Sequence, residues 1–205
     1  MVENNKMSAF EVTYEKIRDM IFNGELSNGQ KITETKLAEQ LGVSRTPIRE
    51  AIKRLEQEKL IAENRVANPT DRDYQNIFEM RILIEKYAIV KAVQFFTDSD
   101  VEEMERLVEI GYSGTKEETM EANKAFHERI VAATKNDVMI DYFNQMQSII
   151  YLFRKTVLHY KRPGLIDEHK AIVDAIKDRD ASRAERLIEE HLQADLDFAL
   201  YYLRK

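Results

Sequence analysis

The sequence contains no cysteine, only 6 glycines and 3 prolines in 205 residues, and no apolar run close to the roughly 20 residues of a membrane span. Without cysteine the chain has no disulfide and no thiol chemistry, which fits a reducing compartment. Few glycines and prolines with many charges favour a helical globular protein, of one large domain or two modest ones. The N-terminal stretch MVENNKMSAF lacks the apolar core of a signal peptide, so we expect a cytoplasmic location.

The net charge of −6 is unevenly distributed along the chain. Residues 1–65 hold 11 basic and 11 acidic side chains, so the other 140 residues, with 20 against 26, carry the whole excess. Within the neutral part, residues 44–54 hold four basic side chains and one acidic side chain. Attraction to phosphates is short-ranged at physiological salt, and a local basic face is therefore enough for a compact DNA-binding module. An acidic protein is not excluded from binding DNA.

Residues 1–66 show the pattern of a helix-turn-helix module followed by a short extended piece. Ser8 and Glu11 form a capping-box pattern before a helix that should end near Asn23-Gly24. Thr33 is expected to cap the short helix ETKLAEQL, which Gly42 ends. A third helix follows, with Ser44 as its cap, Pro47 in its first turn, and an apolar stripe of Ile48, Ala51, Ile52 and Leu55. The compact turn at Gly42-Val43 joins the last two helices.

Arg45 and Arg49 lie one helical turn apart at the start of this third helix, opposite its apolar stripe. In a helix-turn-helix this end enters the major groove, where arginine can donate two hydrogen bonds to guanine. Ser44 and Thr46, beside the first N–H groups of the helix, are expected to contact phosphates. Lys53 and Arg54 are expected to add attraction to phosphates of any sequence. The alternative is a solvated basic face. The helix caps, the glycine turn and the position of the two arginines at the start of the helix together favour DNA binding.

Residues 67–205 are predicted to form an antiparallel bundle of six helices, because helical patterns alternate with short connections and no strand pattern occurs. The expected helices span roughly 70–95, 98–112, 116–134, 137–160, 164–178 and 181–203. Their predicted caps include Thr97, Asn136 and Asp180.

Three of the four histidines, His127, His169 and His191, fall on apolar stripes of three different helices. Asn123 lies one turn before His127, so their side chains share a face. Each histidine could be a core residue with its own hydrogen-bond partner, and three such partners would then be needed. A shared divalent metal ion would satisfy all three. The pattern leaves both interpretations open.

Arg81 lies within the apolar stripe of the first bundle helix. A buried guanidinium group requires an anion. It could pair with an internal Asp or Glu, or it could bind a small carboxylate ligand. Arg154, within the stretch YLFRKTV, is a weaker candidate of the same kind.

The segment from Tyr14 to Ala62, above all LGVSRTPIREAIKRLE, resembles the winged helix-turn-helix of GntR-family bacterial transcription regulators. The stretches NKAFHERI, DEHKAIVDAI and RAERLIEEHL are similar to the FCD-type effector domain of the FadR subfamily. The resemblance implies a homodimer that binds a palindromic operator and responds to a small organic acid. In the metal-bearing branch of the family, an Asp and three His hold a divalent metal, and the ligands carry over to Asn123, His127, His169 and His191.

The sequence departs from the family pattern at three places. Asn123 replaces the usual Asp and gives the site a neutral ligand, which favours zinc or nickel over manganese. The segment after EKLIAENR is about five residues shorter than the usual wing and has no glycine at its tip. Thr35 stands where fatty-acid-responsive relatives carry an arginine that contacts DNA.

The sequence therefore predicts a DNA-binding regulator, expected to be a repressor, that is controlled by a small carboxylate at a metal site with Arg81 and Arg154 nearby. A regulator whose effector is the metal itself is the first alternative, and a metal-dependent enzyme is the second. No glycine-rich phosphate loop, nucleophile elbow or metalloprotease motif supports an enzyme.

Overall fold

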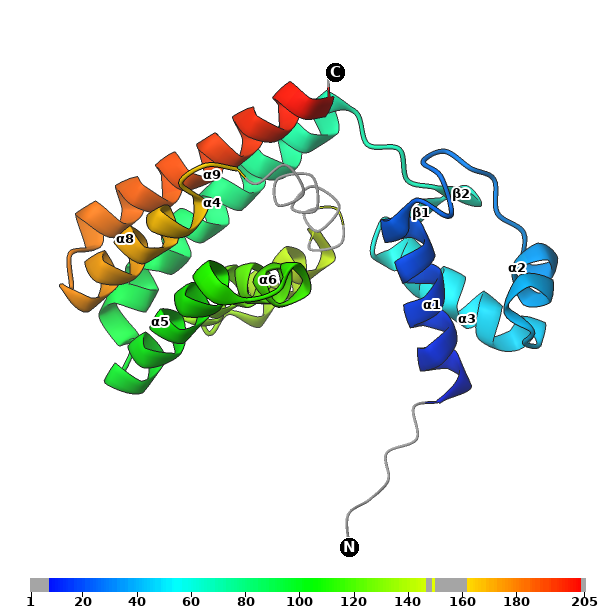
Figure 1. Cartoon of the computed structure of the whole chain (residues 1–205), viewed down its shortest axis with the longest axis horizontal. Helices are drawn as coiled ribbons and strands as arrows, with labels where there is room; N and C mark the ends of the chain where they lie inside the picture. The colour runs from blue at the N-terminus through cyan, green and yellow to red at the C-terminus, as the bar shows by residue number, and fades with distance from the viewer. Residues whose placement is uncertain (1–7, 147–148, 150–161, 204–205) are drawn as a thin grey trace, which may run out of the picture. The chain divides into compact units, whose positions relative to one another are not determined.

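The structure is a computed structural model of the chain and describes residues 8–146, 149 and 162–203 (Figure 1). The chain divides into two compact units at the junction of Pro69 and Thr70. Both units are mainly helical, as predicted. Among the described residues, no helix combines the length and the apolar character of a membrane span.

The first unit contains three helices and a two-stranded sheet. Its elements are α1 (Ala9–Asn23), α2 (Glu34–Leu41), α3 (Arg45–Gln57), β1 (Ile61–Ala62) and β2 (Arg65–Val66).

Local signals set the ends of these helices. The Ser8 side chain accepts a hydrogen bond from the Glu11 amide and the Glu11 side chain accepts one from the Ser8 amide, so the capping box is complete. Gly24 and Gly42 end α1 and α2 in the left-handed region, with φ of 79° and 65°. Ser44 occupies the N-cap position of α3, but its side chain makes no capping hydrogen bond, contrary to expectation.

The predicted apolar stripe of α3 is fully formed. Ile48, Ala51 and Leu55 have no exposed surface, and α3 packs against both α1 and α2. This contact fixes which face of α3 turns outward, because the stripe and the basic side chains lie on opposite sides of the helix.

The wing is a minimal hairpin. β1 and β2 are antiparallel, with Ile61 opposite Val66 and Ala62 opposite Arg65. The two turn residues, Glu63 and Asn64, have φ of 51° and 56°, the left-handed backbone of a two-residue type I′ turn. The turn therefore forms without the glycine that the family wing carries at its tip.

In the second unit the helix bounds follow the predicted ones within a few residues. They are α4 (Asp71–Phe95), α5 (Asp98–Ser113), α6 (Lys116–Ala132), α8 (Leu165–Lys177) and α9 (Ala181–Leu203). Between α6 and α8, residues 137–146 are also helical, and of these residues 145 and 146 are grouped with the first unit. The rest of the predicted helix 137–160, and Arg154 with it, lies outside the described residues apart from residue 149. The predicted caps Thr97, Asn136 and Asp180 each accept an amide hydrogen bond at the start of a helix.

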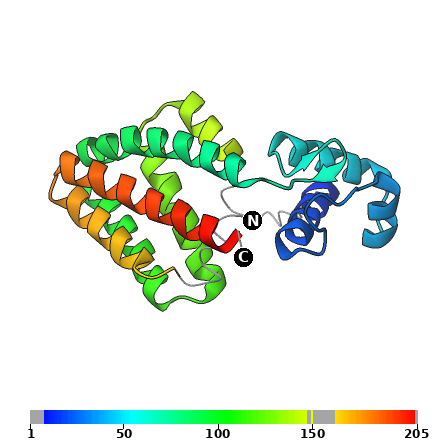
Figure 2. The same cartoon turned by 90° about the horizontal axis from the view of Figure 1, so that it is seen from above.

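Helix pairs build the second unit around one interior. The long helices α4 and α9 lie side by side, and α9 also packs along α8 (Figure 2). Helix α6 contacts α4 and α5, while α5 also contacts α8. The interior faces of α4, α6, α8 and α9 thus meet, and three of these helices carry the histidines.

Candidate functional site

The predicted DNA-contacting residues lie on the outer surface of the first unit. Six of the seven are exposed and Pro47 is half-buried; the exposed ones are Thr35, Ser44, Arg45, Thr46, Arg49 and Lys53. All of them belong to α2, to α3 or to the residue that precedes α3. The structure thus places the predicted contacts on neighbouring parts of one helix pair.

The two arginines predicted to read bases share one carboxylate. Glu34 accepts hydrogen bonds from Arg49 Nε at 3.0 Å and from Arg45 Nη2 at 2.9 Å. These bonds, that from Arg49 first, hold the pKa of Glu34 at about 2, so the carboxylate is charged at neutral pH. No sequence pattern marks Glu34 as part of the site, because a charged residue at the start of a helix is usually solvated.

Arg54 behaves differently from the other basic residues of α3. Its guanidinium group lies 4.0 Å from the centre of the Tyr14 ring and donates to Glu58 at 3.2 Å. The Tyr14 hydroxyl donates to the same carboxylate at 2.8 Å. Arg54 therefore takes part in packing α1 on α3, and Lys53 is the better candidate for a phosphate contact on this helix.

The three histidines meet in the interior of the second unit. His127 on α6, His169 on α8 and His191 on α9 are at most 2% exposed, and each offers a ring nitrogen within 4.8 Å of the other two. The Nε2 atoms of His169 and His191 are 3.2 Å apart. The Phe126 ring stacks on His169 with the ring centres 3.9 Å apart, which fixes the plane of that imidazole. This cluster can hold a metal ion.

Carboxylates orient two of the imidazoles. His127 Nδ1 lies 2.6 Å from Glu85 of α4, and His191 Nδ1 lies 2.8 Å from Glu168 of α8. An ionised carboxylate only accepts hydrogen bonds, so each Nδ1 carries the proton and each Nε2 is left as the ligand atom. Such carboxylate–histidine pairs are the usual second layer of a metal site.

Two buried arginines neutralise the carboxylates around the cluster. Arg81, with no exposed surface, donates to Glu85 at 2.6 Å and lies 3.8 Å from Asp195. Arg162 Nε is 2.8 Å from Asp195, and its Nη1 donates to Glu168 at 2.9 Å. Burial alone would raise the pKa of Glu168, but hydrogen bonds from His191 and Arg162 outweigh it and the pKa is lowered. Arg81 thus has internal anionic partners, one of the two alternatives that its position left open.

Asn123 is a buried polar residue without an evident protein partner. Its side chain is on α6, one turn before His127, and the residue is 3% exposed. Neither amide atom has a hydrogen-bond partner among the residues that the structure describes. A buried amide in this position costs free energy unless something else binds it.

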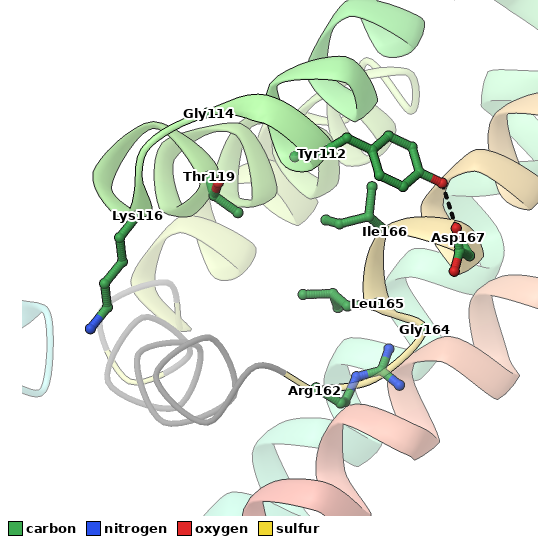
Figure 3. A pocket seen from close by; sticks show the side chains of 10 residues that line it. Tyr112, Gly114, Lys116, Thr119, Arg162, Gly164, Leu165, Ile166 and Asp167 are labelled. Carbon is green, nitrogen blue, oxygen red and sulfur yellow. Dashed lines mark hydrogen bonds between the residues drawn. The ribbon is translucent and has the colours of Figure 1, made fainter.

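A surface pocket lies at the N-terminal end of α8 (Figure 3). Leu165 and Ile166 form part of its lining, and the Tyr112 hydroxyl donates to Asp167 at its edge at 2.6 Å. Arg162 lines the pocket and also lies 3.2 Å from His191 Nδ1. One side chain thus reaches from the pocket wall to the histidine cluster.

The histidines and Asn123 were predicted from the sequence, but four charged residues around them were not, namely Glu85, Arg162, Glu168 and Asp195. A usable signal existed for Glu85, which lies four residues after Arg81 and so shares its inward face. Asp195 bears the same relation to His191.

Two family profiles cover most of the chain. The profile of bacterial regulatory proteins of the GntR family matches residues 10–65, and the FCD domain profile matches residues 76–194. The chain therefore belongs to the GntR family of DNA-binding transcriptional regulators and carries an FCD domain, as the resemblance implied.

Individual relatives agree with this assignment. The chain is 27% identical over 208 residues to the uncharacterised HTH-type transcriptional regulator YdhC of Bacillus subtilis, covering 94% of this chain and 91% of the relative. It is 28% identical over 181 residues to the gluconate operon transcriptional repressor of Bacillus licheniformis, covering 80% and 74%. The structure of E. coli McbR/YncC has the same fold, with a TM-score of 0.77 at 21% identity over 97% of this chain and 100% of that one. The relatives are regulators, and the chain is a regulator rather than an enzyme.

Loss of one buried carboxylate should strongly destabilise the second unit. Replacing Glu85 with Leu leaves the Arg81 charge buried with only the more distant Asp195, and we expect a loss of about 3–5 kcal/mol in the free energy of unfolding. Urea denaturation of the full chain measures it. Glu79→Leu, at an exposed position of the same helix, is the matched control and should stay within about 0.5 kcal/mol of the unmodified protein. Equal midpoints for the two variants would contradict the account.

Proposed function

We propose that this GntR-family protein is a homodimeric repressor whose affinity for a palindromic operator is controlled by a small carboxylate bound at a divalent metal site. The observation that carries the proposal is the buried cluster of His127, His169 and His191, with carboxylates behind two of the rings. One relative is named as a repressor of a gluconate operon, and gluconate is a small hydroxy acid. That name supports both the direction of control and the class of effector.

Base reading is assigned to Arg45 and Arg49. Their guanidinium groups are on the exposed start of α3, with side chains 61% and 67% exposed, and α3 is the second helix of the helix-turn-helix. Thr46 and Ser44 lie at the same helix end and are assigned to phosphates, while Thr35 on α2 and Pro47 complete the contact surface.

Replacing either arginine should therefore reduce both affinity and specificity. Arg45→Ala or Arg49→Ala should cost about 1–3 kcal/mol on the preferred duplex and relax the base preference at one position in each half-site. Lys53→Ala should weaken binding to all duplexes alike. Anisotropy titrations of the full chain, on the duplex that it enriches from a random pool, measure both effects. An Arg49→Ala variant with intact affinity and base preference would refute the assignment.

The residues of the cluster fit a divalent ion. The three imidazoles would bind it through Nε2, and the buried amide of Asn123 offers an oxygen that no described residue binds. Neutral nitrogen ligands suit zinc or nickel. A bound ion would act as a Lewis acid for an oxygen ligand, and the protein residues would fix its surroundings.

The charges around the cluster favour an anionic effector. Three carboxylates (Glu85, Glu168, Asp195) face two guanidinium groups (Arg81, Arg162), which leaves one negative charge in the shell. A divalent ion then makes the site positive by one charge, and a monocarboxylate neutralises it. The pocket is lined by Arg162, which lies 3.2 Å from His191 Nδ1, so a ligand bound there would be close to the cluster.

Metal and effector should each stabilise the fold. At a hundredfold excess over its dissociation constant, a ligand of the folded state adds about 2.7 kcal/mol. We expect zinc or nickel to raise the melting temperature of the chelator-treated full chain, and a small carboxylate to raise it further. His169→Ala should abolish the metal-dependent rise while helical content is unchanged.

One outcome would exclude the metal site, and another would exclude the carboxylate as effector. Protein purified without chelators that contains no metal, together with no thermal shift from zinc or nickel, would exclude it. If metal alone changes operator affinity and no carboxylate adds to the change, the metal itself is the effector.

Dimerisation is assigned to a second copy bound along the outer face of α4. Met80, Leu83 and Tyr87 are 48%, 65% and 50% exposed and lie at helical spacing on one face. Lys86 lies beside Leu83 and Tyr87 and is paired with Glu189 of α9, so a two-fold contact would place apolar surface on itself with an ion pair at its edge. A two-fold protein also suits half-sites about one DNA turn apart.

The full chain should sediment as a dimer at micromolar concentration. Leu83→Glu places a charge in the centre of the stripe and should give a monomer. Val138→Glu, at a similarly exposed apolar position (66%) outside the stripe, is the control and should remain dimeric. A monomeric unmodified chain, or a dimeric Leu83→Glu variant, would show that this face is not the interface.

A further inference from the structure

Glu34 joins the two arginines that the proposed function assigns to base reading. It is the first residue of α2, and its carboxylate lies against the first turns of α3. Arg49 donates to it from Nε at 3.0 Å and from Nη2 at 3.1 Å, and Arg45 donates from Nη2 at 2.9 Å. One carboxylate thus binds both guanidinium groups in the DNA-free protein.

We propose that Glu34 is a positioning residue for sequence discrimination: it holds Arg45 and Arg49 in orientations suited to bases and weakens their attraction to phosphates of any sequence. The inference rests on the proposed role of the two arginines. Glu34 itself is not assigned a contact with DNA.

The arrangement leaves the arginines able to read guanine. A guanidinium group has five N–H donors, and Arg49 uses its Nε and one Nη2 donor for Glu34. The donors on Nη1 and the second one on Nη2 remain, at the end of the fork that makes two hydrogen bonds to guanine O6 and N7. Arg45 gives only one donor to Glu34.

Holding the side chains in advance reduces the entropy lost on binding a base. Both arginine side chains are more than 60% exposed and would otherwise sample many rotamers. A site whose donors are already oriented loses less freedom when it binds. Phosphate contacts gain less from this, because charge attraction has little dependence on direction.

The carboxylate also reduces the positive charge at the helix end. Two guanidinium groups beside one carboxylate present a net charge of +1 instead of +2, and binding to arbitrary sequences depends on that charge. The lowered pKa of Glu34, about 2, means that this contribution exists above the ordinary carboxyl range and is lost only as the pH falls toward 2. It is therefore constant between about pH 5 and 8.

A purely structural ion pair between α2 and α3 is the competing explanation. Exposed ion pairs contribute little to stability, and removing one would leave the ratio of specific to non-specific binding unchanged. Specificity, not stability, is therefore the informative measurement.

The test compares Glu34→Gln with Glu39→Gln in the full chain. Glu39 is an exposed carboxylate on the same helix, outside the described contacts of the two arginines, so both variants lose the same charge. Each is titrated against the duplex that the unmodified protein enriches from a random pool, and against a scrambled duplex of equal composition, at several salt concentrations.

For Glu34→Gln we expect tighter binding to the scrambled duplex, a salt slope steeper by about 0.9, and a specificity ratio at least about tenfold lower. For Glu39→Gln the two affinities should move together and the ratio should stay the same. If Glu34→Gln matches Glu39→Gln, or loses affinity for both duplexes equally, the inference is wrong.

Arg49→Ala separates this inference from the proposed function. If Arg49→Ala abolishes base preference while Glu34→Gln does not alter the ratio, only the positioning role of Glu34 fails. If Arg49→Ala keeps base preference, the base-reading assignment fails and the role of Glu34 with it.

Discussion

The hydrogen bond between His127 Nδ1 and Glu85, 2.6 Å long and without exposed surface, is the interaction on which the interior of the second unit depends. A carboxylate can be buried there only with a cation beside it, and Arg81 supplies that cation. Arg81 in turn lies near Asp195, which contacts Arg162, and Arg162 binds the Glu168 carboxylate that faces His191. The chain of alternating charges starts at one histidine and ends at another. Its members come from four separate segments, so the packing of these helices also determines where the charged groups lie around the histidines.

The two units use arginine–carboxylate pairs in opposite ways. In the second unit the Arg81–Glu85 pair is fully buried, and loss of one partner leaves an uncompensated charge in a low-dielectric interior, which is costly. In the first unit the pairs of Glu34 with Arg45 and Arg49 are exposed, so they add little to stability. Their consequence is orientation and net charge at a helix end, which matter for DNA and not for folding. The same kind of ion pair thus contributes to stability in the second unit and to discrimination between DNA sequences in the first.

Much of the fold was predictable because its signals are local. The N-caps at Ser8 (with Glu11), Thr33 and Thr97 each act within one helical turn, and Gly42 ends its helix by its own backbone conformation. The structure confirms each of these helix ends. Ser44 is an exception, since its position at a helix start is correct but its hydroxyl makes no cap. The apolar stripe of α3 was equally readable, because a period near 3.6 residues is a property of the sequence alone.

The charged residues around the histidines were not predictable in the same way. Arg162, in the stretch KRPG, reads as part of a connection, yet it is 7% exposed because α8 and α9 close over it. Burial of a charge depends on partners distant in sequence, and no local pattern carries that information. Arg54 shows the reverse case, since a basic residue expected near phosphates is held instead by Tyr14 and Glu58.

X-ray absorption spectroscopy of the full chain loaded with zinc is the direct test of the proposed metal site. We expect the ion to be bound by three imidazole nitrogens at about 2.0–2.1 Å with oxygen completing the site, and a small carboxylate to change only the oxygen part of the spectrum. We also expect His169→Ala to remove one nitrogen or the metal itself. A spectrum with oxygen ligands alone, unchanged in the His169→Ala variant, would contradict the proposed site.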